Sequence, residues 1–277
     1  MRNFMDDASK QTSQKSIWGN GDAYESYVGR WSRLVAREFL DWLAVPPQSR
    51  WLDVGCGTGA FSQAILQSAA PGIVRGIDKS DGYIAFARRQ IRDGRVHFDV
   101  GDAQALPVGT AEFDVAVSGL ALNFIPQPKQ ALIEMARAVR PGGKVACYVW
   151  DYAGKMQFMR HFWNAAVALD QVAYDLDEGR RSPLCNPEPL TALFRSVNLN
   201  DIEVIPIEIA TDFSSFDDYW LPFLAGEGPA PGYTMSLSEE SRVALRERIR
   251  ASLPFALDGS IPLVARAWAV KGTVYST

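Results

Sequence analysis

The sequence has few of the residues that metal centres and disulfide frameworks require. Its 277 residues include three cysteines (Cys56, Cys147 and Cys185) and two histidines (His97 and His161). Cysteines so widely scattered give neither a disulfide framework nor metal-ligand spacing. A zinc or two-metal hydrolase would need a denser set of ligands than this. We therefore expect no metal site, and a reducing compartment such as the cytoplasm.

Long hydrophobic runs and an excess of positive charge are also missing. No apolar run reaches the roughly 18 residues that a membrane-spanning helix needs. The polar stretch MRNFMDDASKQTSQKS has no apolar signal core. The formal net charge of -4 disfavours a nucleic acid as the main partner. We expect a cytoplasmic protein without a membrane span or a nucleic-acid partner, and its oligomeric state stays open.

What the sequence does contain is an alternation of two patterns. Short apolar runs alternate with segments of helical spacing, and strands alternating with helices predict a parallel, doubly wound sheet with right-handed crossovers. Two later apolar runs bring the strands to seven, so we predict an α/β fold with a mostly parallel, seven-stranded Rossmann-like sheet. The expected strands are 50–54, 73–78, 95–100, 113–118, 144–150, 201–210 and 262–270, and the helices between them are 60–67, 81–91 and 129–139.

The remaining segments are expected to surround this sheet. Apolar residues at helical spacing from Tyr24 to Trp42 predict an N-terminal helical cover. Aromatic-rich residues 155–180, followed by a helix near 187–197, predict a helical insertion after the fifth strand. Other expected features are a turn at 141–143, a Gly/Pro-rich loop at 225–233 and a charged helix at 239–253.

These expectations give a simple division of the chain. Residues 1–19 are predicted to be disordered, and 20–277 to form a single domain. Within it we expect a cofactor-binding core at 20–150, a substrate-cover region at 151–260 and the last strand at 261–271.

The turn after the first predicted strand reads DVGCGTG, from Asp53 to Gly59. Its glycines allow unusual backbone angles and close approach of a ligand, and the helix that follows offers free N–H groups. In an open parallel sheet, ligands bind beyond the carboxyl ends of the strands. The spacing is G-x-G-x-G, unlike the G-x-G-x-x-G of a dinucleotide site. We therefore predict a small-molecule site at this turn.

Two aspartates stand where the next two strands end. Asp78, in RGIDKS, suits the paired hydroxyls of a ribose, which fits both a nicotinamide and another adenosyl cofactor. Asp102, in GDAQALP, lies beside the same predicted crevice. A carboxylate next to a backbone N–H suits the edge of an adenine.

Five motifs together resemble a known family. WLDVGCGTGAFS, GIDKSDGYIAFAR, GDAQALPV, FDVAVSGLALNFI and ALIEMARAVRPGGKV have the order and spacing of the class I S-adenosylmethionine-dependent methyltransferases. The sequence is most similar to the small-molecule "type 11" subgroup, which includes quinone-biosynthesis and malonyl-carrier methyltransferases. The resemblance centres on residues 20–150.

The resemblance implies a set of cofactor contacts. The glycine turn would pass under the methionine part, with Asp53 orienting the turn, and Asp78 would bind the ribose. Asp102 would hold adenine, and a tyrosine or arginine of the N-terminal helix would meet the methionine carboxylate; a helix packed on the sheet is the alternative for that segment. The full set is Tyr24, Tyr27, Arg30, Asp53, Gly55, Gly57, Thr58, Gly59, Asp78, Lys79, Ser80, Tyr83, Asp102, Ala103, Ser118, Gly119 and Leu120.

The implied reaction is in-line transfer of a methyl group from S-adenosylmethionine to an O, N or C atom of a small molecule, leaving S-adenosylhomocysteine. Such a transfer chiefly needs proximity and alignment. Where the acceptor must lose a proton, His161 is the candidate base, with a packed helix histidine as the alternative. The acceptor pocket would come from the part beyond Trp150, where most of the aromatic residues are expected to form a hydrophobic cover packed on the sheet and a few to face the crevice. The competing functions are a nicotinamide-dependent oxidoreductase and a non-catalytic S-adenosylmethionine-binding protein.

Overall fold

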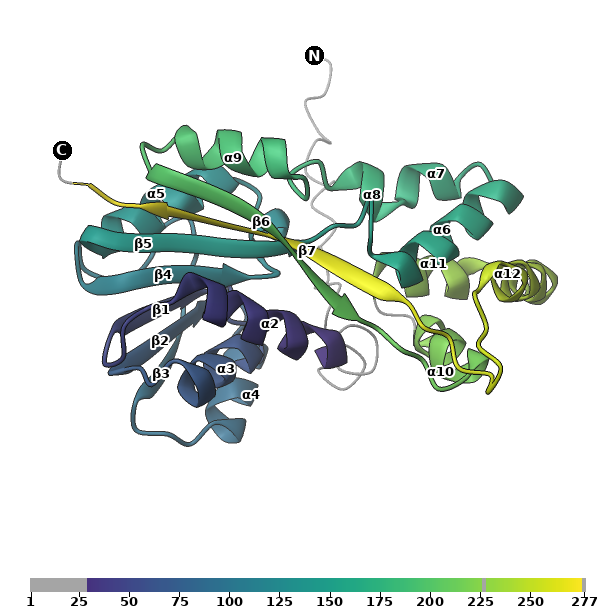
Figure 1. Ribbon diagram of the computed structural model, residues 1–277, viewed down its shortest axis with the longest axis horizontal. Helices are drawn as coiled ribbons and strands as arrows, with labels where there is room; N and C mark the ends of the chain where they lie inside the picture. The colour runs from purple at the N-terminus through teal and green to yellow at the C-terminus, as the bar shows by residue number, and fades with distance from the viewer. Residues whose placement is uncertain (1–28, 226–227, 276–277) are drawn as a thin grey trace, which may run out of the picture.

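The apolar runs of the sequence form one seven-stranded sheet in a computed structural model of the protein, which describes residues 29–225 and 228–275 (Figure 1). The order across the sheet is β3-β2-β1-β4-β5-β7-β6. The strands are β1 (Arg50–Val54), β2 (Ile73–Asp78), β3 (Val96–Val100), β4 (Phe113–Gly119), β5 (Val139–Trp150), β6 (Asn200–Ala210) and β7 (Val264–Thr273).

The first five strands are parallel, and the last two are antiparallel to their neighbours. β1 pairs with β2 on one side and β4 on the other, while β7 lies between β5 and β6. Strand order therefore reverses at β1, which makes the carboxyl ends of β1 and β4 the switch point where ligands bind in such sheets. This arrangement confirms the predicted doubly wound sheet and its mostly parallel character.

One group of helices lies against the sheet. Along the N-terminal cover helix, Val35, Phe39 and Leu43 recur every fourth residue and are fully buried. Their spacing places one apolar face against the sheet and the next helix, which fixes the cover in place. This group comprises α2 (Arg30–Leu43), α3 (Ala60–Ser68), α4 (Asp81–Gln90), α5 (Pro128–Ala138) and α9 (Pro187–Arg195).

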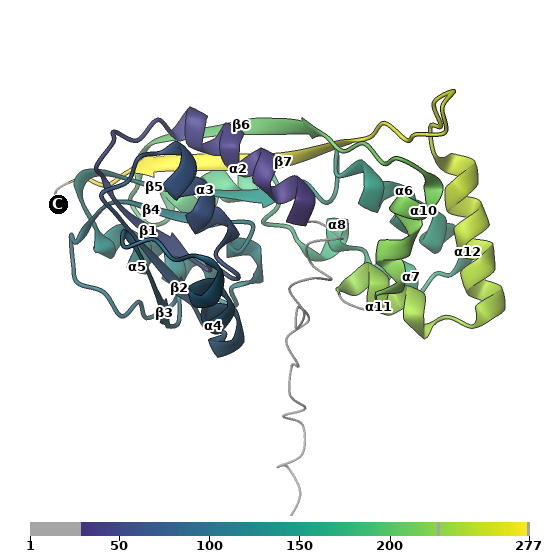
Figure 2. The ribbon, with the colours of Figure 1, turned by 90° about the horizontal axis from the view of Figure 1, so that it is seen from below.

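A second group of helices lies beyond the end of the sheet, and Figure 2 shows it joined to the sheet along β6 and β7. We call this group, residues 157–181, 216–225 and 228–252, the helical lobe. It is made of α6 (Gln157–Leu169), α7 (Ala173–Leu176), α8 (Glu178–Arg181), α10 (Phe216–Trp220), the 3₁₀ turn η3 (Leu221–Leu224), α11 (Pro229–Ser236) and α12 (Glu239–Ser252). The helices α6 to α8 are the predicted insertion after the fifth strand.

Aromatic rings form the core of the helical lobe. Phe162 is fully buried and stacks on Phe223 with ring centroids 4.5 Å apart. The hydroxyl of Tyr219, also fully buried, donates a hydrogen bond to the carbonyl of Phe158 at 2.6 Å. These rings pack on one another and form a hydrophobic cover, the role that the sequence predicts for most of the aromatic residues beyond Trp150.

Two predicted boundaries are wrong. The predicted loop at 225–233 is partly helical, because Pro229 begins α11 at a position where proline's missing N–H is not needed. The predicted turn at 141–143 lies inside β5, where Gly142 has a φ of +80° and donates its N–H to the carbonyl of Val274. The pairing register between β4 and β5 shifts at this point, between Phe113 and Val115, and β5 continues beyond the glycines.

Within residues 29–225 and 228–275, no helix combines the length and the apolar character that crossing a membrane requires.

Candidate functional site

The three glycines after β1 have different surroundings. All have positive φ, at +75° for Gly55, +54° for Gly57 and +87° for Gly59. A Cβ on Gly55 would lie 2.6 Å from that of Ala121, and one on Gly59 would lie 2.7 Å from Cδ1 of Ile91. A Cβ on Gly57 would have no described atom within 4 Å. Gly55 and Gly59 thus permit tight packing, whereas Gly57 faces space that no described residue fills.

Asp78, at the end of β2, holds the glycine turn. Its Oδ2 accepts the N–H of Gly57 at 3.0 Å, and its Oδ1 accepts the N–H of Ser80 at 2.9 Å. A carboxylate offers about four acceptor positions. Both oxygens of this half-buried side chain therefore keep capacity for a further donor. Ser80 caps α4 by accepting the N–H of Tyr83, while Lys79 is exposed.

Asp53 lies under the turn and is completely buried. Its Oδ2 accepts a hydrogen bond from the hydroxyl of Ser62 on α3 at 2.6 Å. Its Oδ1 has no partner among the residues that the structure describes. Burial raises the pKa of Asp53 to about 7, against the opposing hydrogen bond from Ser62 and with a smaller contribution from the charge of Asp78. Asp53 thus links the turn to α3 through Ser62. With a pKa of about 7, its carboxyl group changes protonation state near neutral pH.

Asp102 follows β3 and is exposed. Its Oδ1 accepts the backbone N–H of Gln104 at 2.8 Å and the side-chain amide of the same residue at 3.1 Å. The side-chain oxygen of Gln104 in turn accepts the N–H of Gln127, 3.1 Å away, at the start of α5. Gln104, for which no role was predicted, therefore connects the predicted adenine loop, which includes half-buried Ala103, to the start of α5, the helix that follows β4.

The segment after β4 packs on the glycine turn. Ser118 is completely buried, and its Oγ has no hydrogen-bond partner within the described part of the chain. That oxygen would lie 4.0 Å from a Cβ placed on Gly55. Leu120 has a left-handed φ of +56°, and its N–H donates to the carbonyl of Tyr148 on β5 at 2.8 Å. Ser118, Gly119 and Leu120 are therefore brought to the same edge of the sheet as the glycine turn.

A short 3₁₀ turn, η2 (Leu122–Phe124), continues this segment. Asn123 within it has a buried side-chain nitrogen, Nδ2, without an acceptor in residues 29–225 and 228–275. Phe124, the next residue, is 52% exposed. No sequence pattern points to Asn123, because the unsatisfied state of an asparagine in an apolar motif is visible only when the burial of its side chain is known.

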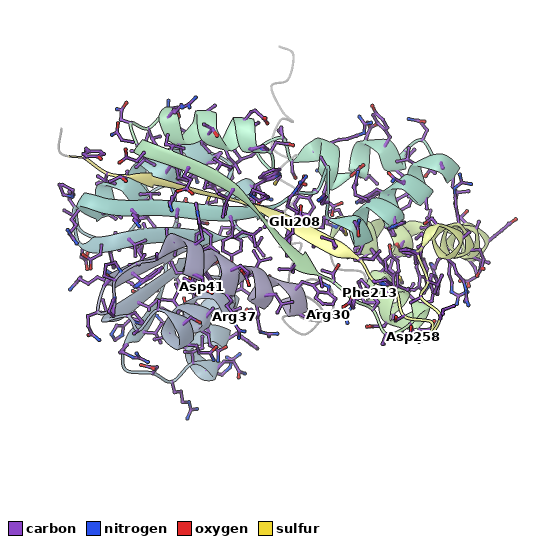
Figure 3. All side chains as sticks on the ribbon, viewed as in Figure 1. Arg30, Arg37, Asp41, Glu208, Phe213 and Asp258 are labelled. Atoms are coloured by element: carbon purple, nitrogen blue, oxygen red, sulfur yellow. The ribbon has the colours of Figure 1, made fainter. Side chains whose placement is uncertain are left out.

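Of the three cofactor contacts predicted on the N-terminal helix, the structure describes Arg30. Tyr24 and Tyr27, like residues 1–19, lie outside the described residues. The guanidinium of Arg30 donates from Nη1 to Asp218 of α10 at 2.8 Å, and its Cζ lies 4.5 Å from the ring centroid of Trp31 and 4.6 Å from that of Phe213. Figure 3 labels Arg30 and the neighbouring Phe213. Arg30 thereby links α2 to the helical lobe. Its predicted contact with the methionine carboxylate stays a prediction.

His161 lies on α6 and faces α12, where its Nδ1 is 3.1 Å from the hydroxyl of Ser252. Burial lowers the pKa of its imidazole. This contact joins two helices of the lobe, which is a packing role, and the catalytic role of His161 stays a prediction. Among the described residues, no group of three His, Cys, Asp or Glu side chains could hold a metal ion.

Comparison with known proteins agrees with this geometry. The family model described as "Methyltransferase domain" matches residues 52–147, from β1 into β5. Demethylmenaquinone methyltransferase of Halalkalibacterium halodurans is 31% identical over 169 residues, which are 56% of this chain and 69% of that protein. The chain belongs to the methyltransferase family.

Other relatives of this methyltransferase match over shorter spans. Malonyl-[acyl-carrier protein] O-methyltransferase of Methylococcus capsulatus is 33% identical over 43% of this chain and 44% of its own length. Two further demethylmenaquinone methyltransferases are matched over 48% and 46% of their lengths, so the chain spans about half of those relatives.

A solved structure supports the fold. Phosphoethanolamine N-methyltransferase 2 of Haemonchus contortus, in complex with S-adenosyl-L-methionine, superposes with a TM-score of 0.57 at 18% identity. The match covers 97% of this chain and 59% of that one. At this identity the likeness concerns the architecture alone.

Proposed function

We propose that this methyltransferase binds S-adenosylmethionine and transfers its methyl group to a small-molecule acceptor, leaving S-adenosylhomocysteine. The observation that carries the proposal is the bond between Asp78 and the N–H of Gly57 at the switch point of the sheet. It joins a carboxylate suited to a ribose to a turn whose central glycine faces open space.

The residues at this edge fit the cofactor. Gly57 leaves room that any side chain would fill, Asp78 keeps free acceptor positions, and the buried Oγ of Ser118 lacks a partner among described residues. In this assignment the turn from Gly55 to Gly59, with Thr58, lies beneath the methionine part. Asp78 takes the ribose hydroxyls, flanked by Lys79, Ser80 and Tyr83. Asp102 and Ala103 take the adenine, and 118–120 lie near the methyl group.

The protein's part in the chemistry is alignment. The sulfonium of the bound cofactor supplies an already activated methyl group. The chain fixes the geometry around it: Asp53 anchors the turn to α3 through Ser62, and the contact of Leu120 with Tyr148 fixes the end of β4. Holding donor and acceptor in line at a sheltered edge provides most of the acceleration that such a displacement needs.

The acceptor is proposed to be a small molecule. The relatives named above act, by their names, on demethylmenaquinone and on malonyl-[acyl-carrier protein], which supports an organic acceptor in place of a nucleic acid. The acidic net charge of -4 agrees with that choice. We assign the covering of the acceptor to the helical lobe, in which α6 to α8 follow β5 and α10 to α12 lie between β6 and β7.

Two measurements test this proposal. Calorimetric titration with S-adenosylhomocysteine and, separately, with NAD should give binding for the first only. Incubation with methyl-labelled S-adenosylmethionine and a metabolite extract of the host cell should give a labelled product, identified by mass spectrometry. Preferential binding of NAD would favour the oxidoreductase. Binding of S-adenosylhomocysteine without any labelled product would favour a non-catalytic binding protein.

A further inference from the structure

The order of the strands divides the proposed site into two sides. β2 and β3, which end at Asp78 and Asp102, lie on one side of β1, and β4 and β5 lie on the other. If the proposed function holds, the nucleoside occupies the β2–β3 side. The methyl acceptor then approaches from the β4–β5 side, where the chain enters the helical lobe (Figure 1).

Asn123 stands on that acceptor side, directly after β4. Its backbone is fixed on both flanks: Leu120 donates its N–H to Tyr148, and Phe124 donates its N–H to the carbonyl of Ala121 at 2.9 Å. The side-chain Nδ2 is shielded from solvent and lacks an acceptor in the described ranges 29–225 and 228–275. An exposed apolar ring, that of Phe124, follows it in the chain.

A buried donor without an acceptor lowers the stability of the folded protein, and such groups are few in native structures. Functional sites are among the places where such local rules are broken. The Oγ of Ser118 is a second such atom at the same strand end. Two unsatisfied polar atoms after one strand indicate a polar ligand group there.

We propose that Asn123 donates a hydrogen bond from Nδ2 to the methyl acceptor. The acceptor must then present an oxygen lone pair near the reacting atom, as in a carboxylate, an enolate or a phenolate, none of which has a proton to lose on methylation. A lone pair of the acceptor forms the bond to the methyl carbon, and the electrons of the broken carbon–sulfur bond return to sulfur. Asn123 keeps its protons throughout and orients the acceptor oxygen.

Asn123→Leu tests the proposal, because leucine has a similar shape and no donor. The melting temperature of the ligand-free variant should equal or exceed that of the wild type, since an unsatisfied polar group has been removed. Affinity for S-adenosylhomocysteine should stay unchanged. Turnover of the extract acceptor with methyl-labelled S-adenosylmethionine should fall about 100-fold, the usual effect of losing one aligned donor.

Ser62→Ala is the matched control, since its buried hydroxyl is satisfied by Asp53. That variant should melt at a lower temperature than the wild type, which shows that the assay detects the loss of a structural hydrogen bond.

Three results would overturn the assignment of Asn123. A lower melting temperature for Asn123→Leu would mean that another segment already satisfies the amide. Weaker binding of S-adenosylhomocysteine would mean that Asn123 contacts the cofactor. Unchanged turnover would mean that it contacts neither. Failure of the wild type to bind S-adenosylhomocysteine would instead contradict the proposed function.

Discussion

The carboxyl edge of the sheet and the helical lobe differ in how far their buried polar atoms are hydrogen-bonded. At the edge, the buried atoms Oδ1 of Asp53 and Oγ of Ser118 have no partners among the described residues. In the lobe, Arg160 of α6 forms a bidentate ion pair with Asp177 and leaves only its Nε without a partner among the described residues. The hydroxyl of Tyr219 donates to a backbone carbonyl. One region leaves hydrogen-bonding capacity for a ligand, whereas the other uses most of it to hold itself together.

An open cleft in the lobe also has charged side chains that are mostly paired with other groups of the protein. It has a volume of about 430 Å³ and lies between α6 and the short helices α7 and α8. Of its charged side chains, Arg160 pairs with Asp177, and Arg180 lies 3.5 Å above the ring of Tyr174. A hollow whose charged groups are mostly paired is a weaker candidate for catalysis than the edge, where Asp53 and Ser118 each have a buried oxygen without a partner among the described residues.

The strongest test of this contrast is Gly57→Val. A branched side chain would fill the open space over the turn and resist a φ of +54°, so binding of S-adenosylhomocysteine should be lost while most of the fold survives. Gly59→Ala is the comparison, because its Cβ would strike Ile91 and lower the melting temperature. Calorimetry and thermal denaturation measure both effects. If Gly57→Val bound S-adenosylhomocysteine with nearly the wild-type affinity, the glycine turn would have a structural role only and would not be part of the cofactor site.

In the lobe, Phe162→Ala should cost about 3–5 kcal/mol of unfolding free energy, the usual range for a buried aromatic ring. The folded variant should bind S-adenosylhomocysteine as the wild type does. Leu169→Ala is the control on the same helix, since Leu169 is 47% exposed and should change little. Urea denaturation gives the stabilities. A folded Phe162→Ala protein with weakened cofactor binding would contradict the separation of the two regions.

Asp53→Asn should change how stability depends on pH. The folded protein retains a proton on Asp53 up to a pKa of about 7, while the unfolded chain releases it near the ordinary value of 3.8. The group therefore lowers the free energy of unfolding as the pH rises from 4 to 7, and the loss levels off above 7. Relative to the wild type, the variant should gain at most about 4 kcal/mol over this interval.

Urea denaturation at pH 4.5 and pH 8 measures that gain. Glu178, whose pKa burial also raises to about 7, is present in both proteins and cancels in the difference. An equal stability difference at the two pH values would show that Asp53 ionises normally.

The smallest effect is expected for Asp78→Ala. It removes a charged acceptor, so cofactor binding should weaken by about 1–3 kcal/mol. Asp99→Ala on the neighbouring strand is the control, because Asp99 pairs with Arg75 at 2.9 Å and should leave the affinity unchanged. Calorimetric titration of both folded variants with S-adenosylhomocysteine measures their affinities. Equal affinities for all three proteins would remove Asp78 from the ribose site.

Local patterns predicted the parallel half of the molecule well. β1 and β2 have the expected bounds, because each is a short apolar run that ends at a glycine or aspartate turn. The glycine turn, Asp78 and Asp102 were named for the same reason, since the fold places strand ends together whatever the side-chain packing. α11 was missed because glycine and proline indicate a loop in sequence, although proline also begins helices.

Features that depend on distant contacts could not be predicted. Arg30 and Asp218 are 188 positions apart, and no pattern in the sequence joins them. The choice between ring packing and an open aromatic pocket in the lobe is likewise a matter of orientation, as the stack of Phe162 on Phe223 illustrates. The unsatisfied amide of Asn123 appears only when the burial of one atom is known.

The position of β7 has a consequence for synthesis on the ribosome. This strand is the last of those described along the chain, yet it lies between β5 and β6 and pairs with both. A nascent chain that has not reached Val264 exposes the open edges of β5 and β6, which invite pairing with other chains. The parallel strands that carry the glycine turn are synthesised well before. Stalled or shortened products should therefore aggregate through the far side of the sheet, with the region around the cofactor turn already formed.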